Sequence, residues 1–139
     1  MKQFLDKVEV VTRGRGFYAV TDDVDAVVRK SAIREGLATL HLQHTSASLV
    51  IQENADPEVR RDLERFISRL VPDGDPLFRH TAEGEDDMPA HVRAVLTAVS
   101  LSIPIVDGGL ALGTWQGVFL WEHRAQGHRR RIVIHLLGK

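Results

Sequence analysis

The sequence predicts a single domain of the α+β class, with mixed or largely antiparallel sheets and about three helices. Strand-like and helix-like segments are interspersed along the 139 residues without the regular alternation of a doubly wound fold. Several strand-like segments are separated only by short turns, which is typical of antiparallel pairing. The length suits one domain over residues 1–139 that can bury a core without cross-links.

Two strands, over residues 3–11 and 15–20, are predicted at the N-terminus. Apolar and aromatic side chains lie densely there on both sides of a glycine-containing turn. A first helix is predicted over residues 23–35, where valines and an alanine recur at helical spacing. Gly36 is expected to end this helix, because glycine readily adopts the left-handed conformation.

Alternation of apolar and polar residues predicts a strand over residues 37–43, and an apolar run predicts another over 47–52. A second helix is predicted to follow Asp56, which can cap it, and Pro57, which suits a first helical turn. Its apolar stripe consists of Val59, Leu63, Phe66, Ile67 and Leu70.

The second half of the chain is predicted to contain a long loop, one helix and several short strands. Residues 71–79 form the loop and lead into an acidic segment. A third helix is predicted over 89–101, with Asp86 or Asp87 as its cap and Val92, Val95, Leu96 and Val99 facing inward. The predicted strands that follow are 103–106, 110–112, 117–122 and 131–137.

The composition excludes several classes of protein. The formal net charge is -1, so the chain has no general attraction to polyanions, and we expect no nucleic-acid partner. Without cysteines, any metal ion must be bound by nitrogen and oxygen. The first residues carry charges where a signal peptide needs an apolar core, and no apolar run is long enough to cross a bilayer. We therefore expect a cytoplasmic protein without a membrane partner.

The segment from His80 to His91 is the most informative part of the sequence, because its two histidines flank four carboxylates. Carboxylates at this spacing resist simultaneous ionisation unless a metal ion, arginines or water offset their charge. A solvated acidic loop is the alternative to a site. As a site, the segment is predicted to bind a divalent metal ion, Mg²⁺ or Zn²⁺. The candidate metal ligands are His44, His80, Glu83, Asp86 and His91.

Polar side chains also lie at the ends of two predicted strands. His44, Thr45 and Ser46 follow one strand, and Asn54 follows the next. These residues are candidates for a functional site. Hydroxyl groups this close in sequence commonly bond the local backbone, so a purely structural role is the alternative to a functional one. A serine-hydrolase mechanism is disfavoured, because the chain has no Gly-x-Ser-x-Gly motif.

A glycine-rich segment and a basic segment follow in the last third. Gly113 opens a stretch of small and amide side chains around Trp115, which predicts either close approach of the backbone to a ligand or a tight bend. Planar guanidinium groups suit phosphate or carboxylate. Arg124, Arg129 and Arg131 can therefore bind an anionic substrate or offset the carboxylates after His80, with an exposed basic hairpin as the alternative.

Several sequence blocks, in this order, resemble those of the YjbQ-like family, also named secondary thiamine-phosphate synthase. They are His44-Thr-Ser-Ala-Ser-Leu, Glu53-Asn-Ala-Asp-Pro, His80 through Glu83-Gly-Glu-Asp-Asp-Met-Pro-Ala-His91, Gly113-Thr-Trp-Gln-Gly and Glu122-His-Arg. The resemblance extends over nearly the whole chain. It implies a compact α+β domain that assembles as a homotrimer, with the polar residues of the blocks gathered in a pocket.

The resemblance also implies a function. The expected activity, as a main or a side reaction, is that of a transferase that joins a phosphorylated thiazole to a pyrimidine diphosphate and releases pyrophosphate. A divalent metal ion and cationic groups suit this chemistry, because charge develops on the leaving group. The expected catalytic residues are His44, Ser46, Asn54, Asp87, His91 and Glu122. The expected substrate-binding residues are Thr45, Gly113, Thr114, Trp115, Gln116, Arg124, Arg129 and Arg131.

Two alternative functions stay open. One is a metal-dependent hydrolase in which His44, His80 and His91 bind zinc and Glu83 or Glu122 acts as general base. The other is a non-catalytic trimer that captures a small phosphorylated metabolite in the same pocket.

Overall fold

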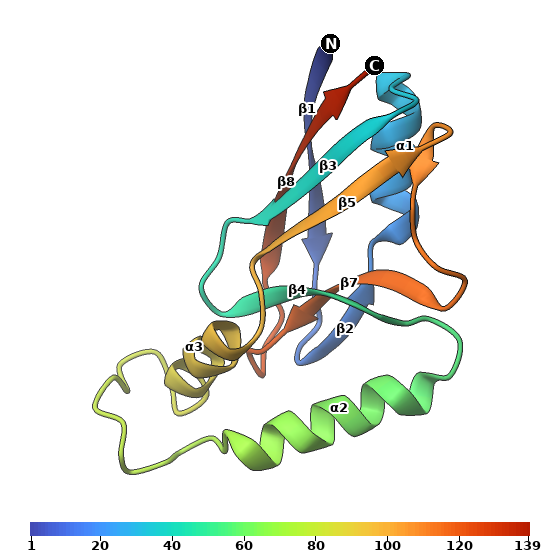
Figure 1. Ribbon diagram of the computed structural model, residues 1–139. Coiled ribbons are helices and arrows are strands. Elements are labelled where there is room, and N and C mark those ends of the chain that lie inside the picture. Colours follow the sequence, from blue (N-terminus) through green and yellow to red (C-terminus); the bar gives the residue numbers. More distant parts are fainter.

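The computed structural model describes residues 1–139, which fold into two antiparallel sheets and three helices (Figure 1). Every strand pairing is antiparallel, so the predicted α+β class is confirmed. The five-stranded sheet has the order β1 (Lys2–Val11), β8 (Arg129–Gly138), β3 (Gly36–Leu42), β5 (Ser100–Val106) and β6 (Gly109–Leu110). The three-stranded sheet has the order β2 (Gly16–Ala19), β7 (Gln116–Glu122) and β4 (Ala47–Glu53).

Strands that are neighbours in the sequence are often separated in space. β1 pairs with β8, the last strand, so the two termini lie close together at one end of the molecule (Figure 1). β3 and β4 belong to different sheets, and the short segment 43–46 carries the chain from one sheet to the other. The polar residues of this segment therefore lie at the junction of the two sheets.

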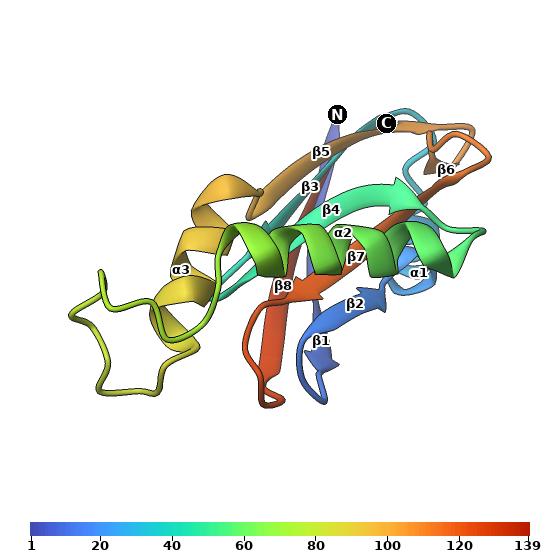
Figure 2. The same cartoon turned by 90° about the horizontal axis from the view of Figure 1, so that it is seen from below.

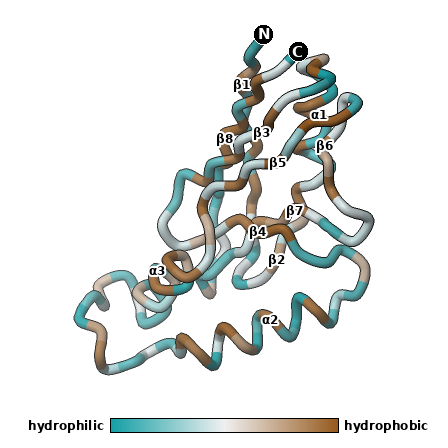
Figure 3. Tube along the Cα trace, viewed as in Figure 1, coloured by the Kyte–Doolittle hydropathy of each residue, from teal (hydrophilic) through white to brown (hydrophobic).

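The core combines the inner face of the five-stranded sheet with α1 (Thr21–Ser31) and one face of the three-stranded sheet. Alternation along the strands turns one set of side chains inward, as the complete burial of Leu40, Ile132 and Ile134 shows. The same alternation of hydropathy follows the strands in Figure 3. Close packing of these layers fixes the strand ends on which the candidate site is built.

The first helix is shorter at its C-terminus than predicted. α1 ends at Ser31, and Ala32 adopts the left-handed conformation with φ of 59°, a role that the sequence assigns to Gly36. The backbone N–H groups of Arg34 and Glu35 donate to the main-chain oxygen of Lys139 at 2.8 and 2.9 Å. Hydrogen bonds to Lys139 therefore replace the last predicted helical turn.

The second helix, α2 (Pro57–Leu70), begins as predicted. Asp56 accepts a hydrogen bond from the backbone N–H of Glu58 at 2.9 Å, as a cap should. The helix lies along the outer side of β4 and β7 (Figure 2). Of its apolar stripe only Ile67 is buried, whereas Phe66 and Leu70 are 56% and 57% exposed. α2 is thus a loosely packed outer layer.

The third helix, α3 (Asp87–Leu96), begins earlier and ends earlier than predicted. The backbone carbonyl of Val99 accepts from Leu42 of β3 at 2.8 Å, so the chain already follows the sheet at this point. The inward face also differs from the prediction, because Val95 is 83% exposed while Arg93 is buried. No helix of the structure combines the length and apolar character needed to cross a membrane.

Candidate functional site

Asp87 brings two histidines together at the start of α3. Its Oδ2 atom lies 2.7 Å from Nε2 of His80 and 3.3 Å from Nε2 of His91. Asp87 and His91 share one face of α3, whereas His80 comes from the preceding loop. One ligand atom from each of these residues lies within 4.8 Å of the other two. This His80–Asp87–His91 group has the nitrogen and oxygen composition of many transition-metal sites.

The segment between β3 and β4 fixes the orientation of His91. Nδ1 of His91 lies 2.9 Å from the main-chain oxygen of Thr45. Because a carbonyl oxygen only accepts, Nδ1 carries the proton and donates it, and in a neutral ring Nε2 is then a lone pair. That lone pair faces Oδ2 of Asp87, which is also an acceptor. A second proton or a metal ion between them satisfies both atoms.

Arg124, directly after β7, holds two neighbouring carboxylates. Its Nε donates to Oδ2 of Asp86 at 3.0 Å, and Nη1 lies 3.0 Å from Oδ1 of Asp87. Its Nη2 donates to the main-chain oxygen of Glu83 at 2.9 Å. The backbone N–H of Ala125 also donates to Asp86, at 2.9 Å. Asp86 is therefore turned toward Arg124, which is also why it does not cap α3 with its side chain.

These contacts keep both carboxyl groups ionised. Burial alone would raise the pKa of Asp87, but the hydrogen bond with His80 and the charge of Arg124 outweigh it and lower that pKa. Burial is likewise outweighed at Asp86, where hydrogen bonds from Ala125 and Arg124 lower the pKa. Burial would lower the pKa of Arg124, but the carboxylates raise it. Asp87 is thus available as a charged ligand at neutral pH.

The structure gathers only part of the predicted ligand set. His80 and His91 lie in the group, and Glu83 lies at its edge, with Oε2 3.6 Å from Nε2 of His80. Asp86 is excluded by its pairing with Arg124. The carboxylate of the group is instead Asp87, a residue that the sequence assigns to catalysis.

A buried ion pair between β7 and β8 lies at the same end of the sheets. Nε of Arg130 donates to Oε1 of Glu122 at 2.8 Å, and Nη2 contacts the other carboxylate oxygen. Thr12 donates to Oε1 at 2.6 Å, and the backbone N–H of Arg124 donates to Oε2 at 3.2 Å. Burial alone would raise the pKa of Glu122, but the hydrogen bonds from Arg130 and Thr12 lower it. Glu122 is closed to solvent, so its contacts are those of a positioning group and not of an accessible base.

Arg130 connects this ion pair to the segment that orients His91. Its Nη2 donates to the main-chain oxygen of Ser46 at 3.2 Å and to the hydroxyl oxygen of Ser46 at 3.0 Å. Ser46 directly follows Thr45, whose carbonyl holds His91. Ser46 is only 8% exposed and therefore anchors this segment, instead of presenting a nucleophile.

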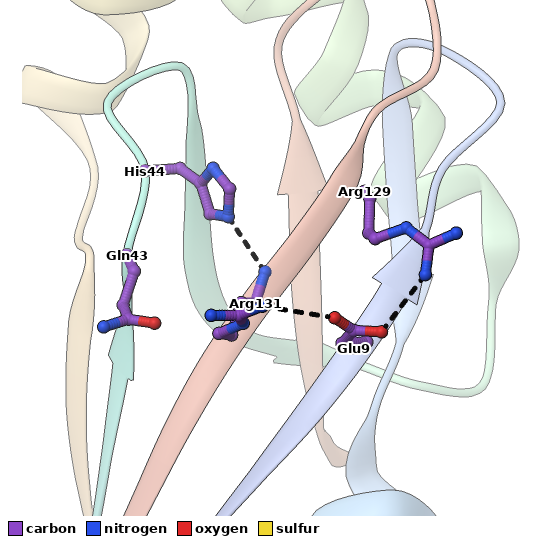
Figure 4. Close-up of a pocket in the computed structure, with 5 residues that line it drawn as sticks. All are labelled: Glu9, Gln43, His44, Arg129 and Arg131. Atoms are coloured by element: carbon purple, nitrogen blue, oxygen red, sulfur yellow. Dashed lines mark hydrogen bonds and ion pairs between the residues drawn. The ribbon is translucent and has the colours of Figure 1, made fainter.

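His44 faces a different pocket, on the outer side of β1 and β8 (Figure 4). Nε2 of His44 accepts the backbone N–H of Arg131 at 2.9 Å. Burial, followed by the charge of Arg130, lowers the pKa of His44 and favours the neutral ring. Nδ1 of His44 lies 3.4 Å from Nη1 of Arg130, so both ring nitrogens face β8 and not the His80–Asp87–His91 group, which explains why His44 is not part of it. The pocket has a volume of about 150 Å³ and is lined by Glu9, Gln43, His44, Arg129 and Arg131.

Asn54 and the segment 113–117 lie at the far end of β7 from Glu122 (Figure 1). The side-chain amide of Asn54 donates to the main-chain oxygens of Thr114 and Gln116, both at 3.4 Å. The backbone N–H of Gly113 donates to Oε1 of Gln116 at 2.8 Å. β7 spans about 20 Å between the two ends. Within one chain these residues, including the 64% exposed Trp115, are not brought to the histidines.

Three buried polar residues of this region escape prediction from sequence. Arg130 lies between Arg129 and Arg131, which are exposed, so the basic segment as a whole reads as surface. Strand alternation nevertheless places Arg130 on the inward face with Ile132, and this periodicity could have identified it as buried. His123 is fully buried, with Nε2 2.9 Å from the hydroxyl oxygen of Ser48 and Nδ1 without a partner. Arg93 is 1% exposed, and no sequence signal distinguishes it from a surface arginine of α3.

The sequence profile of a protein family matches almost the whole chain. The family is described as UPF0047 protein YjbQ-like, and the match covers residues 6–139. The chain is 49% identical to a UPF0047 protein of Synechocystis, over 99% of this chain and 94% of that protein. It is 45% identical to the UPF0047 protein YjbQ of Escherichia coli, over 91% of this chain and 92% of that protein.

Solved structures share the same fold. A YbjQ-like protein of Sulfolobus solfataricus superposes with a TM-score of 0.90 at 26% identity and covers 99% of both chains. A conserved protein of Thermus thermophilus superposes with a TM-score of 0.86 at 36% identity, over 95% of this chain and 99% of that chain. The arrangement of sheets and helices described above is therefore common to these proteins.

Proposed function

The chain belongs to the UPF0047 family of YjbQ-like proteins, and we propose that it is a metal-dependent transferase of the thiamine-phosphate-synthase type. In this reaction a phosphorylated thiazole is joined to a pyrimidine diphosphate: a C–N bond forms and pyrophosphate leaves. The observation that carries the proposal is the His80–Asp87–His91 group, which places three ligand atoms beside the guanidinium of Arg124. The sequence blocks that contain these residues supply the reaction class.

The donor set fits one metal ion. The ligand atoms of a tetrahedral zinc ion are about 3.4 Å apart, and Oδ2 of Asp87 lies 2.7 and 3.3 Å from the two imidazole nitrogens. The carbonyl of Thr45 sets the tautomer of His91, as outer partners of metal-bound histidines commonly do. Two imidazoles suit zinc or another transition metal better than magnesium, which prefers oxygen ligands.

A divalent ion would offset the negative charge around the group. Asp86, Asp87 and Glu83 are three carboxylates against the single guanidinium of Arg124, so a divalent ion would cancel the excess negative charge and remove the repulsion of an anionic substrate. The ion would supply electrostatic stabilisation of phosphate oxygens as they leave. Three nitrogens of Arg124 are already bonded within the chain, so its role is to hold the carboxylates in place.

The pocket of Figure 4 supports phosphate binding close to the group. Arg129 and Arg131 share the single carboxylate of Glu9, at 3.3 and 3.5 Å, which leaves one positive charge without a partner. His44 lies next to Thr45, whose carbonyl contacts His91, so the pocket and the group lie on the same connecting segment. We assign this pocket to a phosphate group of a substrate.

A metal titration combined with an activity assay tests the proposal. Isothermal titration with Zn²⁺, Mn²⁺ and Mg²⁺ should show one site per chain, lost in the Asp87→Asn and His91→Ala proteins. His41→Ala is the matched control, because His41 is exposed and makes no side-chain hydrogen bond. Metal-loaded protein supplied with the two phosphorylated precursors should release thiamine phosphate and pyrophosphate. Unchanged metal binding and turnover in Asp87→Asn would remove this site from the mechanism.

A metal-dependent hydrolase is the second candidate, and the exposure of His80 favours it. The His80 side chain is 46% exposed, so solvent reaches the group and a metal-bound water would have access to a substrate. Release of inorganic phosphate from a simple phosphate ester, without any second substrate and with loss of the activity on chelation, would decide for this alternative. Binding of the precursors without any turnover would decide for a phosphometabolite-binding protein.

We also propose that the chain assembles as a homotrimer. The outer face of the five-stranded sheet supports association, because it leaves large apolar side chains exposed at Leu5, Val11 and Val106, at 68%, 66% and 54%. A trimer also offers the segment 113–117 a second copy of the site to approach. Light scattering of the purified protein should give three times the mass of one chain, and a monomer would contradict this part of the proposal.

A further inference from the structure

We propose that the pocket beside His80 binds a ring of the substrate and selects rings that carry a positive charge or an amino group. This inference rests on the proposed function, because it assigns a part of the substrate to the neighbourhood of the His80–Asp87–His91 group. The pocket has a volume of about 250 Å³ and lies between the loop 74–81 and the start of α3. An apolar cavity of about 150 Å³ already accommodates benzene, so a single substituted ring fits.

His80 belongs both to this pocket and to the metal-binding group. Its Nε2 faces Asp87 at 2.7 Å, while the residue also forms part of the pocket wall. Nδ1 of His80 makes no hydrogen bond within the chain. A molecule in the pocket therefore contacts a residue of the group directly, and its reactive substituent reaches the group without a change of fold.

Part of the pocket wall offers apolar contacts to a ring. Phe78 offers an aromatic side chain, and Met88 a polarisable thioether, both partly buried. Pro89 is buried on the same side, in the first turn of α3. Flat apolar groups of this kind bind a planar ring on its faces and leave the ring edge to polar side chains.

Charge then decides which ring is favoured. Asp75 and Glu85 line the pocket, neither forms an ion pair, and no lysine or arginine lines it. Asp75 accepts the backbone N–H of Leu77 at 2.9 Å, which leaves its negative charge uncompensated. The side chain of Glu85 makes no hydrogen bond. A protonated or amino-substituted ring is attracted by these carboxylates, whereas an anionic ring of equal size is repelled.

A panel of equally sized rings tests this selection. Benzamidine and benzylamine are cationic, benzyl alcohol is neutral and benzoate is anionic. Each is titrated into ¹⁵N-labelled full-length protein without added metal, and the dissociation constant is taken from amide shifts of residues 74–89. The cations should bind most tightly, benzyl alcohol more weakly, and benzoate least. Equal affinity across the panel, or shifts confined to other residues, would overturn the proposal.

Two variants separate the contributions of charge and ring contact. Glu85→Gln should weaken benzamidine about threefold and leave benzyl alcohol unchanged, because one exposed charge is removed. Phe78→Ala should weaken every member of the panel. Glu35→Gln is the control for Glu85→Gln, since Glu35 is also exposed and its side chain makes no hydrogen bond or ion pair. An equal loss of benzyl alcohol and benzamidine in Glu85→Gln contradicts selection by charge.

The same proteins distinguish this inference from the proposed function. Ring binding without metal does not depend on turnover. If the protein binds the cationic rings but neither binds metal nor forms product, the ring-binding pocket is supported and the transferase proposal is rejected. If the protein forms product and KM is the same in wild type and Phe78→Ala, the transferase is supported and the ring-binding pocket is rejected.

Discussion

Arg130 donates from Nε to Oε1 of Glu122 at 2.8 Å, and neither side chain is more than 4% exposed. The pair links the end of β7 to the start of β8. Through Ser46 it anchors the segment that orients His91, and through the backbone N–H of Arg124 it fixes the residue that holds Asp87. A buried pair of this kind positions its neighbours, since each member needs the other to remain charged.

Breaking this pair should strongly destabilise the fold. Glu122→Gln leaves the guanidinium of Arg130 buried without a counter-charge, and we expect the free energy of unfolding to fall by about 3–5 kcal/mol. Urea denaturation at pH 7 measures the change. The control is Glu58→Gln, because the Glu58–Arg61 pair is exposed and its loss should cost less than about 1 kcal/mol. Equal losses in the two variants would contradict the special role of the buried pair.

His123 should make the fold sensitive to mild acid. Burial, followed by the charge of Arg93, lowers its pKa from 6.5 to about 3. Between these values the unfolded chain binds a proton that the folded chain does not bind. His123 therefore does not lower the free energy of unfolding above pH 6.5. As the pH drops from 6.5 toward 3, the free energy of unfolding falls by roughly 1 kcal/mol per pH unit. The lowered pKa of His44 acts in the same direction.

Urea denaturation at pH 7, 6 and 5 measures this dependence. His123→Gln removes the titrating group and keeps a polar partner for Ser48, so its stability should change less over this range. The other acidic and histidine residues are common to both proteins, and the difference isolates His123. Parallel pH curves for the two proteins would show that His123 is not the group responsible.

Loss of Arg124 should matter less in strong acid. Arg124→Ala removes the cation that bonds Asp86 and Asp87, and we expect a loss of about 1–3 kcal/mol at pH 7. Both carboxyls have lowered pKa values in the folded chain, so their contribution is present above their ordinary value of 3.8 and is lost as the pH falls further. The difference between the two proteins should shrink below pH 4. Arg124→Lys should be intermediate, because it keeps the charge without the planar fork.

Gly36 should tolerate no side chain. A Cβ atom there would lie 2.1 Å from the main-chain oxygen of Leu137, within the pairing of β3 with β8. We expect Gly36→Ala to cost about 3 kcal/mol or more, because backbone must move. At Gly113 the nearest atom to an added Cβ is 3.5 Å away, so Gly113→Ala should cost less than about 1 kcal/mol. Thermal unfolding of both variants tests the contrast, and similar midpoints would contradict it.

Local chemistry made most of the elements predictable. Asp56 and Pro57 mark the start of α2 because capping and a fixed φ act within a few residues. The strands follow from alternation, which any half-buried strand must show. The ends of α1 and α3 were not predictable in this way, because they are set by hydrogen bonds to the C-terminal residue and to β3.

The candidate site also has a part that local sequence predicts and a part that depends on distant residues. His91 follows Asp87 by one helical turn and His80 precedes it by one short loop, so their meeting follows from local spacing. The sequence cannot show that Arg124 takes Asp86, that Thr45 holds His91, or that His44 faces another pocket. Each of these choices depends on which strand ends the two sheets bring together.

The sequence alone determined the fold class, most of the strands, the capped start of α2 and the close spacing of the residues from His80 to His91, because short-range sterics, hydropathy and capping decide them. It named Asp86 as the carboxylate ligand, whereas the structure places Asp87 there. Only the tertiary structure decided that Glu122, Arg130 and Ser46 form a buried support and that the segment 113–117 lies at the far end of β7. The physical reason is that ion pairs and hydrogen bonds between distant residues depend on distances that only packing of the two sheets establishes.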